Sequence, residues 1–274
     1  MAGRGRSVPV SLDRIDLAAL YREHMTRAGR CEKDPGDWDG RAKAMSQGVF
    51  AGAYVEGFVA RLDLSGCATL LDVGCGPGTI ALTVAPRLER VYGLDYSPGM
   101  LDAFVESARQ RGISNATPIR RAWEDDWADV PECDVVVASR STQVADLAAA
   151  LEKLHRHARR RVYLTHLVGG RFVDDEILQA LGRTDEPLPD YLYVVALLHQ
   201  RGIHPRLDYL EGENRLRHCQ DFADCLRKVT WSLGELTPGE IERLRSYYES
   251  HADRLGRAPR RWALVSWEKD VHRP

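Results

Sequence analysis

Short apolar runs alternate with amphipathic stretches through the middle of the chain. The apolar runs predict five strands, at 69–73, 91–95, 117–120, 134–138 and 161–166. Helical periodicity follows the first, second and fourth of these runs, at 79–88, 98–111 and 143–156. This alternation is typical of a parallel sheet with helices on both faces. The carboxyl ends of the strands then share one edge, and ligands bind along that edge.

Mainly helical segments flank this alternating region. The patterns predict helices at 12–28, 38–58, 174–181, 191–201, 221–232 and 238–254, and further strands at 205–210 and 261–267. We therefore expect an α/β protein with a doubly wound, seven-stranded, mainly parallel sheet. Its parts are an N-terminal arm and helical lid (1–60), an α/β core (61–168) and the remainder of the sheet (169–274). A helical insert at about 212–258 is expected to form a second part of the lid.

Composition narrows the choice of partner. The 274 residues carry a formal net charge of −2, which argues against a nucleic-acid partner. No apolar run approaches the roughly 20 residues that cross a bilayer, so no membrane association is expected. The six cysteines include no Cys-x-x-Cys pair, which favours free thiols, a cytoplasmic location and no metal site. The apolar segment 191–198 packs internally or forms a homodimer, and the sequence leaves both open.

The clearest chemical signal is a glycine-rich turn directly after the first predicted strand. Asp72 lies in that strand, and Gly74, Gly76 and Gly78 follow at alternate positions before a helix that opens near Thr79. Such a turn lets ligand atoms approach the backbone, and the helix start directs free N–H groups at them. The third glycine comes one residue early for a dinucleotide fingerprint, which disfavours that class of ligand.

A second acidic residue supports a nucleotide-like ligand. Asp95 ends the second predicted strand, 23 residues after Asp72. An acid in this place accepts hydrogen bonds from ribose hydroxyls in doubly wound folds. Ser97 and Pro98 then supply the cap and first position of the next helix.

Segments 72–78 and 93–101 together resemble the class I S-adenosylmethionine-dependent methyltransferases, most closely the small-molecule group. The resemblance covers roughly residues 37–168, and segment 38–42 resembles the element that covers the cofactor. It implies a Rossmann-like fold, S-adenosylmethionine as cofactor, and in-line methyl transfer to O, N, S or C of a small-molecule substrate. The alternatives are an RNA or protein methyltransferase and a non-methylating protein that binds S-adenosylmethionine.

The resemblance also implies which residues hold the cofactor. These are Asp72, Gly74, Cys75, Gly76, Gly78, Asp95, Tyr96, Met100, Trp123, Glu124 and Ser139. The segment 121–125 departs from the Gly-Asp-Ala that related chains often carry before this point, so the contact to the adenine amino group is open between Glu124, Asp125 and a backbone group. For Trp123 the alternative is plain core packing.

Candidate catalytic and substrate residues lie at the same edge or in the helices before the sheet. His166 ends the fifth predicted strand and is the best-placed general base or substrate ligand, because histidine titrates near working pH. Arg140 follows the fourth strand and would bind a carboxylate of the substrate or of the cofactor. The alternatives are a structural histidine and a simple helix-start loop. Tyr21, His24 and Trp38 would reach the substrate from the N-terminal helices.

Overall fold

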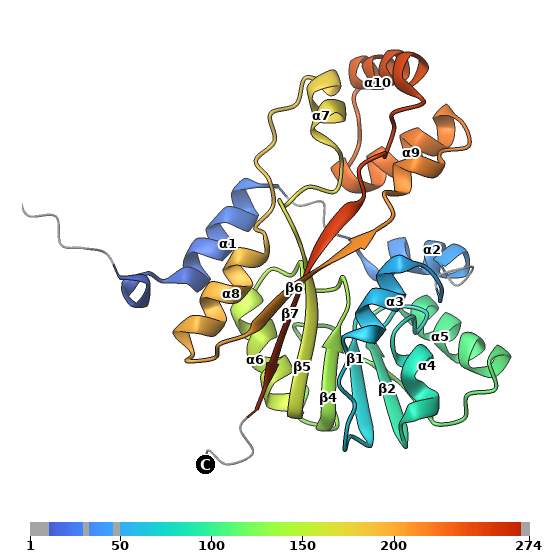
Figure 1. Ribbon diagram of the computed structural model, residues 1–274. Coiled ribbons are helices and arrows are strands. Elements are labelled where there is room, and N and C mark those ends of the chain that lie inside the picture. The colour runs from blue at the N-terminus through green and yellow to red at the C-terminus, as the bar shows by residue number, and fades with distance from the viewer. Residues whose placement is uncertain (1–10, 30–32, 46–49, 270–274) are drawn as a thin grey trace, which may run out of the picture.

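The computed structural model describes residues 11–29, 33–45 and 50–269 (Figure 1). Seven strands form one sheet in the order β3-β2-β1-β4-β5-β7-β6. Their bounds are β1 Thr69–Val73, β2 Arg90–Asp95, β3 Ala116–Arg120, β4 Cys133–Ala138, β5 Ala158–Leu167, β6 Arg206–Gly212 and β7 Arg260–Glu268. Strands β1 to β5 are parallel, and β7 runs antiparallel to both β5 and β6. The predicted doubly wound, mainly parallel fold is confirmed.

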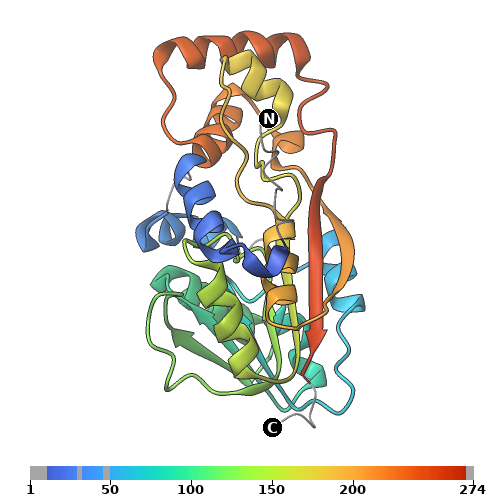
Figure 2. The same ribbon diagram turned by 90° about the vertical axis from the view of Figure 1, so that its left-hand side faces the viewer.

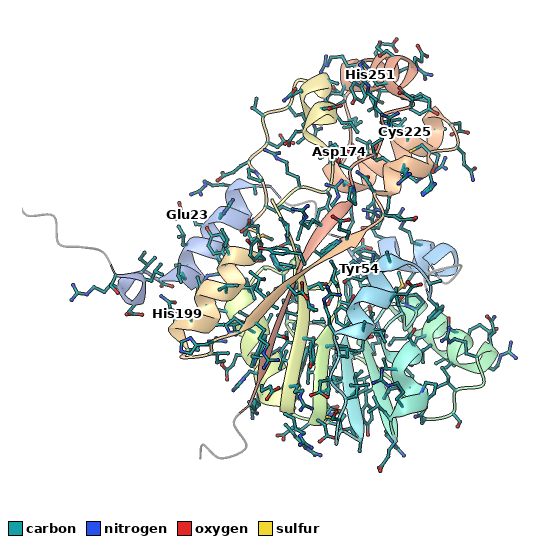
Figure 3. All side chains as sticks on the ribbon, viewed as in Figure 1. Glu23, Tyr54, Asp174, His199, Cys225 and His251 are labelled. Carbon is teal, nitrogen blue, oxygen red and sulfur yellow. The ribbon has the colours of Figure 1, made fainter. Side chains whose placement is uncertain are left out.

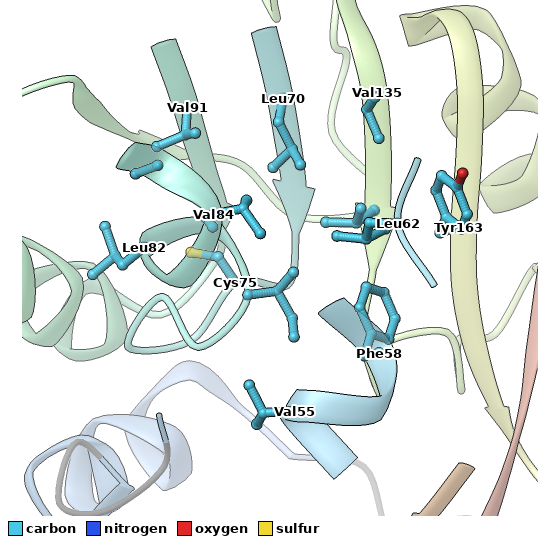
Figure 4. Packing of buried hydrophobic residues seen from close by; sticks show 14 of the residues in the cluster. Val55, Phe58, Leu62, Leu70, Cys75, Leu82, Val84, Val91, Val135 and Tyr163 are labelled. Atoms are coloured by element: carbon cyan, nitrogen blue, oxygen red, sulfur yellow. The ribbon is translucent and has the colours of Figure 1, made fainter. Parts of the chain in front are cut away.

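One face of the sheet is covered by three helices, α3 (Ala53–Ala60), α4 (Ala81–Val84) and α5 (Pro98–Gln110). Their fully buried residues include Phe58 and Phe104, which belong to one apolar cluster with strand residues such as Leu70. Phe58 and Leu70 are labelled in Figure 4. Burial of one such aromatic side chain contributes about 2–3 kcal/mol through the hydrophobic effect. This packing fixes the turn that joins β1 to α4.

The other face carries α1 (Leu17–Arg27), α6 (Leu147–His157) and α8 (Tyr191–Gln200). Val194, Leu197 and Leu198 of α8 are buried in this second core, so most of the apolar segment packs internally, while Leu192 remains 59% exposed. Within the described part of the chain, no helix is long and apolar enough to cross a membrane.

Beyond the carboxyl ends of the parallel strands lie the short helix α2 (Pro35–Met45) and a helical unit made of α7 (Asp175–Leu181), α9 (Phe222–Leu233) and α10 (Pro238–His251) (Figures 1 and 2). This helical unit has an apolar cluster of its own, which includes Ile177, Val229 and Leu244. Arg183 Nε also donates to Glu240 Oε1 at 2.6 Å and joins the α7 end to α10. The unit therefore has independent packing while it stays next to the sheet edge.

Two helices begin later than their periodicity predicts. The first starts at Leu17 instead of residue 12, because Asp16 accepts a hydrogen bond from Ala19 N at 2.9 Å. The helix predicted to start at 143 starts at Leu147, because Asp146 caps it in the same way. Side-chain caps stop a helix where apolar periodicity alone would continue it.

The helix predicted over 38–58 is also divided. Helix α2 ends at Met45, and α3 begins after Gly52, whose φ of 113° is not helical. Residues 46–49 lie outside the described residues. The helix predicted at 79–88 is shorter, since α4 passes into a 3-10 turn at Ala85–Arg87 that contains Pro86.

Candidate cofactor and substrate site

The glycine-rich turn is held from two sides. Gly74 N and Cys75 N both donate to Leu94 O, at 2.7 and 3.0 Å, which fastens the turn to β2. Gly74 has φ +68°, and a Cβ there would overlap the Ser141 side chain. Ser141 Oγ in turn donates to Val73 O at 2.6 Å. Only glycine combines this conformation with so close a neighbour, so the turn has a fixed shape.

Space remains open beside the next glycine. A Cβ at Gly76, where φ is +53°, would have its nearest neighbour, Met100 Sδ, at 3.8 Å. The Asp95 carboxylate lies against this turn, because it accepts hydrogen bonds from Gly76 N at 2.9 Å and Ser97 N at 3.0 Å. Burial raises the pKa of Asp95, while the backbone hydrogen bonds lower it. Each carboxylate oxygen keeps capacity for a further donor, such as a ribose hydroxyl.

Asp72 holds a buried carboxyl group under the turn. Its side chain is buried, and Oδ2 accepts from Ala81 N at 3.1 Å. Among the described residues, Oδ1 has no hydrogen-bond partner. Burial, followed by the charge of Asp95, raises the pKa of Asp72 to about 7. A buried carboxylate oxygen without a donor is costly, so this position fits a ligand that brings a cationic donor, such as the ammonium group of S-adenosylmethionine.

Other predicted cofactor residues take different places. The Cys75 thiol is buried in the core, so only its backbone faces the turn (Figure 4). Gly78 packs against Leu82 and Phe104, which leaves no room for a side chain. Tyr96 Oη donates to Lys33 O at 2.8 Å and so contacts the segment before α2.

Trp123 and Glu124 line a cleft of about 260 Å³ next to α6, together with Asp146 and Lys153. No residue of the glycine turn lines this cleft. The Trp123 ring lies 5.5 Å from that of Trp127, which is buried in the second core. This contact fits the core-packing alternative for Trp123, and its adenine contact stays a prediction.

Asp39 is a site residue that the sequence did not single out. Its Oδ1 accepts hydrogen bonds from Ser97 Oγ at 2.6 Å and Gly99 N at 2.8 Å. Ser97 also caps α5 through Met100 N. These bonds hold α2 against the start of α5, two residues beyond Asp95. The segment 38–42 had marked α2 as a covering element, but nothing local identified its anchoring side chain.

A buried tyrosine, Tyr54 of α3, contacts residues at the ends of β4 and β5 (Tyr54 is labelled in Figure 3). Tyr54 Oη forms hydrogen bonds with Ser139 Oγ at 2.8 Å and Thr165 Oγ1 at 2.7 Å. Thr165 Oγ1 also accepts from Arg140 N at 2.9 Å, and the Arg140 guanidinium lies 4.2 Å from the Tyr54 ring centroid. Burial raises the pKa of Tyr54, so its hydroxyl stays protonated near neutral pH. We name these four residues the Tyr54 cluster.

His166 does not face this cluster. His166 follows Thr165 along β5, so its side chain points to the opposite face of the sheet. There it is fully buried. Its Nδ1 lies 2.8 Å from Thr142 Oγ1, and its Nε2 lies 3.3 Å from Pro189 O. The geometry therefore argues against a general base at His166 and favours the structural alternative, because both ring nitrogens contact the protein interior.

The N-terminal residues are divided between two roles. Tyr21 Oη donates to Val144 O at 2.7 Å, and His24 Nδ1 lies 3.1 Å from Tyr193 Oη, so both fasten α1 to its neighbours. These contacts do not support the prediction that Tyr21 and His24 face the substrate. Trp38 has a different role from these two residues: it lies in α2 and contacts the helical unit, with its ring 5.2 Å from that of Trp231 in α9.

Comparisons with known proteins bear on the family and the fold. Residues 70–161 match the family model described as a methyltransferase domain. An uncharacterized protein from Haemophilus influenzae is 35% identical over 93% of this chain and 97% of its own length. A putative methyltransferase from Bacillus halodurans has a TM-score of 0.56 at 14% identity, and covers 80% of this chain and 99% of that one.

A structure of Haemonchus contortus phosphoethanolamine N-methyltransferase 2 with phosphomonomethylethanolamine and S-adenosylhomocysteine has a TM-score of 0.52 at 17% identity. It covers 87% of this chain and 60% of that one. The fold and the glycine-turn site thus define a Rossmann-like enzyme that binds S-adenosylmethionine. Residues 70–161 form a methyltransferase domain, and the protein is an S-adenosylmethionine-dependent methyltransferase.

Proposed function

We propose that this methyltransferase acts on a small-molecule acceptor enclosed between the sheet edge and a two-part helical cover. One contact carries the proposal: the Trp231 ring of α9 meets Trp38 of α2 edge to face at 5.2 Å, and the Arg41 guanidinium lies 4.0 Å from the Trp231 ring centroid. Two segments nearly 200 residues apart in sequence therefore join across the carboxyl edge. An RNA or protein acceptor would need this edge open.

The chemistry needs orientation more than acid–base catalysis. S-adenosylmethionine supplies an electrophilic methyl group on a sulfonium sulfur. The protein must hold the acceptor atom about 3–3.5 Å from that carbon, in line with the sulfur, and exclude water. Asp72 and Asp95 offer carboxylates for the ammonium and ribose groups. Tyr54 stays protonated and orients Ser139 and Thr165 by hydrogen bonds, so it acts as a positioning residue.

The first test is calorimetric binding of S-adenosylmethionine and S-adenosylhomocysteine to the wild-type protein and to Asp95→Ala. We expect micromolar binding that is lost or much weakened in the variant. Asp102→Asn is the matched control, because Asp102 is exposed on the following helix and loses the same charge. Unchanged affinity in Asp95→Ala would contradict the ribose assignment.

The second test addresses the acceptor. A cell extract is divided by ultrafiltration, and each fraction is assayed for S-adenosylhomocysteine formation. Turnover with the low-mass fraction supports a small-molecule acceptor. Turnover with the retained macromolecules alone would contradict the proposal and favour an RNA or protein methyltransferase.

A further inference from the structure

Two arginines from separate elements, Arg41 and Arg140, lie close enough to a third, Arg215, for their charges to act on it, and Arg140 belongs to the Tyr54 cluster. Arg41 comes from α2, Arg140 from the loop after β4, and Arg215 from a 3-10 turn (Arg215–His218) after β6. Burial, and then the charges of Arg41, Arg140 and Arg260, lower the pKa of Arg215 to about 10. The Arg215 side chain is nevertheless exposed. We name Arg41, Arg140 and Arg215 the arginine cluster.

The described residues place no ion pair on the positive charge of this cluster. Within the described ranges, none of the three guanidinium groups forms an ion pair or a hydrogen bond. Arg260, the fourth charge, differs, because it pairs with Asp174 at 3.1 Å and donates to Phe172 O. Arg41 is half-buried and Arg140 and Arg215 are exposed, so all three groups can reach a ligand, and an anionic ligand would offset the repulsion between their like charges.

Two of the guanidinium groups are held by aromatic rings. Arg41 lies over Trp231 and Arg140 over Tyr54, at 4.0 and 4.2 Å from the ring centroids. A cation–π contact restrains the side chain but leaves N–H groups free to donate. Arg140 also has φ +58°, the one positive φ at a non-glycine residue in the described part of the chain. Such a conformation costs about 1 kcal/mol or more and is found where function requires it.

We propose that the arginine cluster binds an oxyanion of the methyl acceptor, a carboxylate or a phosphate. The inference rests on the proposed function and names its substrate class. Charges are sorted across the site: the carboxylates of Asp72 and Asp95 surround the glycine turn, whereas the arginines come from the cover and the adjoining loop. Guanidinium forks match the geometry of both oxyanions, and donors from three elements would fix the orientation of the acceptor.

The test uses the full chain loaded with S-adenosylhomocysteine and titrated calorimetrically with citrate and, separately, with inorganic phosphate. We expect one of the two to bind, which distinguishes the carboxylate from the phosphate source. Arg215→Gln should weaken that binding by about tenfold or more and leave the affinity for S-adenosylhomocysteine unchanged. Arg217→Gln, in the same 3-10 turn, is the matched control and should change neither affinity.

Three results would overturn the inference. Neither anion binds, or both variants bind the anion as the wild-type protein does. Alternatively, Arg215→Gln loses affinity for S-adenosylhomocysteine, which would assign the cluster to the cofactor carboxylate. Where binding of S-adenosylhomocysteine is retained, it shows that the variant is folded; where it is lost, an unchanged thermal midpoint of the ligand-free variant shows this. A wild-type protein that binds no S-adenosylhomocysteine would instead overturn the proposed function, and this inference with it.

Discussion

Ser97 Oγ donates a hydrogen bond of 2.6 Å to Asp39 Oδ1, so the residue that caps α5 also holds the covering helix α2. The hydrogen bond from Ser97, followed by that from Gly99 N, lowers the pKa of Asp39. The carboxylate is therefore charged at neutral pH. It lies near Asp95, whose pKa its charge raises. The position of α2 and the position of the Asp95 carboxylate, proposed to bind ribose, thus depend on the same short segment, 95–99.

Asp39→Asn should weaken binding of S-adenosylhomocysteine by about tenfold, because a charged acceptor of two hydrogen bonds is replaced by a neutral one. The thermal midpoint of the ligand-free protein should change little, since Asp39 is exposed. Calorimetry and a thermal scan measure the two effects. Asp102→Asn serves as control, and equal affinities in both variants would show that α2 needs no such anchor.

Asp72→Asn should stabilise the ligand-free protein while it impairs cofactor binding. A folded-state pKa raised from 3.8 to about 7 means that ionisation of Asp72 opposes folding as pH rises from about 4 to 7. The gain from the substitution is at most about 4 kcal/mol above pH 7 and is smaller at pH 5.5. Urea unfolding at the two pH values measures it. A variant less stable than the wild-type protein at pH 8 would contradict this account.

Cofactor affinity of the wild-type protein should fall as pH drops below about 7. Asp72 gains a proton in that range, and a protonated carboxyl no longer attracts an ammonium group. Binding should therefore release a proton near pH 6.5, so the calorimetric enthalpy should depend on the ionisation enthalpy of the buffer. An affinity that stays constant from pH 5.5 to 8 would remove Asp72 from the ammonium contact.

Glu240→Ala should loosen the helical unit and leave the sheet intact. Glu240 completes the capping box of α10 with Thr237 and pairs with Arg183, and the hydrogen bond from Arg183 is the main reason that its pKa is lowered to about 2. A lowered pKa means that this contribution is present above pH 4.5 and is lost as pH falls toward 2. We expect a loss of about 1–3 kcal/mol, seen as faster amide exchange in α10.

Glu242→Ala is the matched control for that experiment, because Glu242 is an exposed residue of the same helix. Faster exchange in both variants, or in β1 as well as α10, would show that the helical unit does not open separately from the sheet.

The sequence predicted those parts of the site whose signals are local. Gly74 and Gly76 come just after the first strand, and Asp95 ends the second. The signals for strand, turn and helix start therefore lie within a few residues of one another. The predicted helix start at 238 is likewise confirmed, and Thr237 and Glu240 form its capping box. Tertiary contacts decided the rest. Asp39 meets Ser97 across 58 residues, and such pairs leave no periodic pattern.

His166 shows a second limit of prediction from the sequence, namely the direction in which a strand residue points. It was placed correctly at the carboxyl end of a strand, yet the pleat turns its side chain to the face where Thr142 and Pro189 O surround it. The neighbouring Thr165 reaches the Tyr54 cluster instead. A register of one residue separates the two outcomes, and strand boundaries read from a sequence are less certain than that.

The position of β7 has a consequence for how the chain assembles. β7 pairs with β5 on one side and β6 on the other, so β6 has no neighbour in the sheet until β7 has been synthesised. The helical unit, which lies mostly between β6 and β7, emerges in that interval and can pack on its own apolar cluster. Ribosome-bound intermediates should therefore contain an incomplete sheet with an exposed β5 edge. A chaperone would protect the nascent enzyme until β7 has paired with that edge.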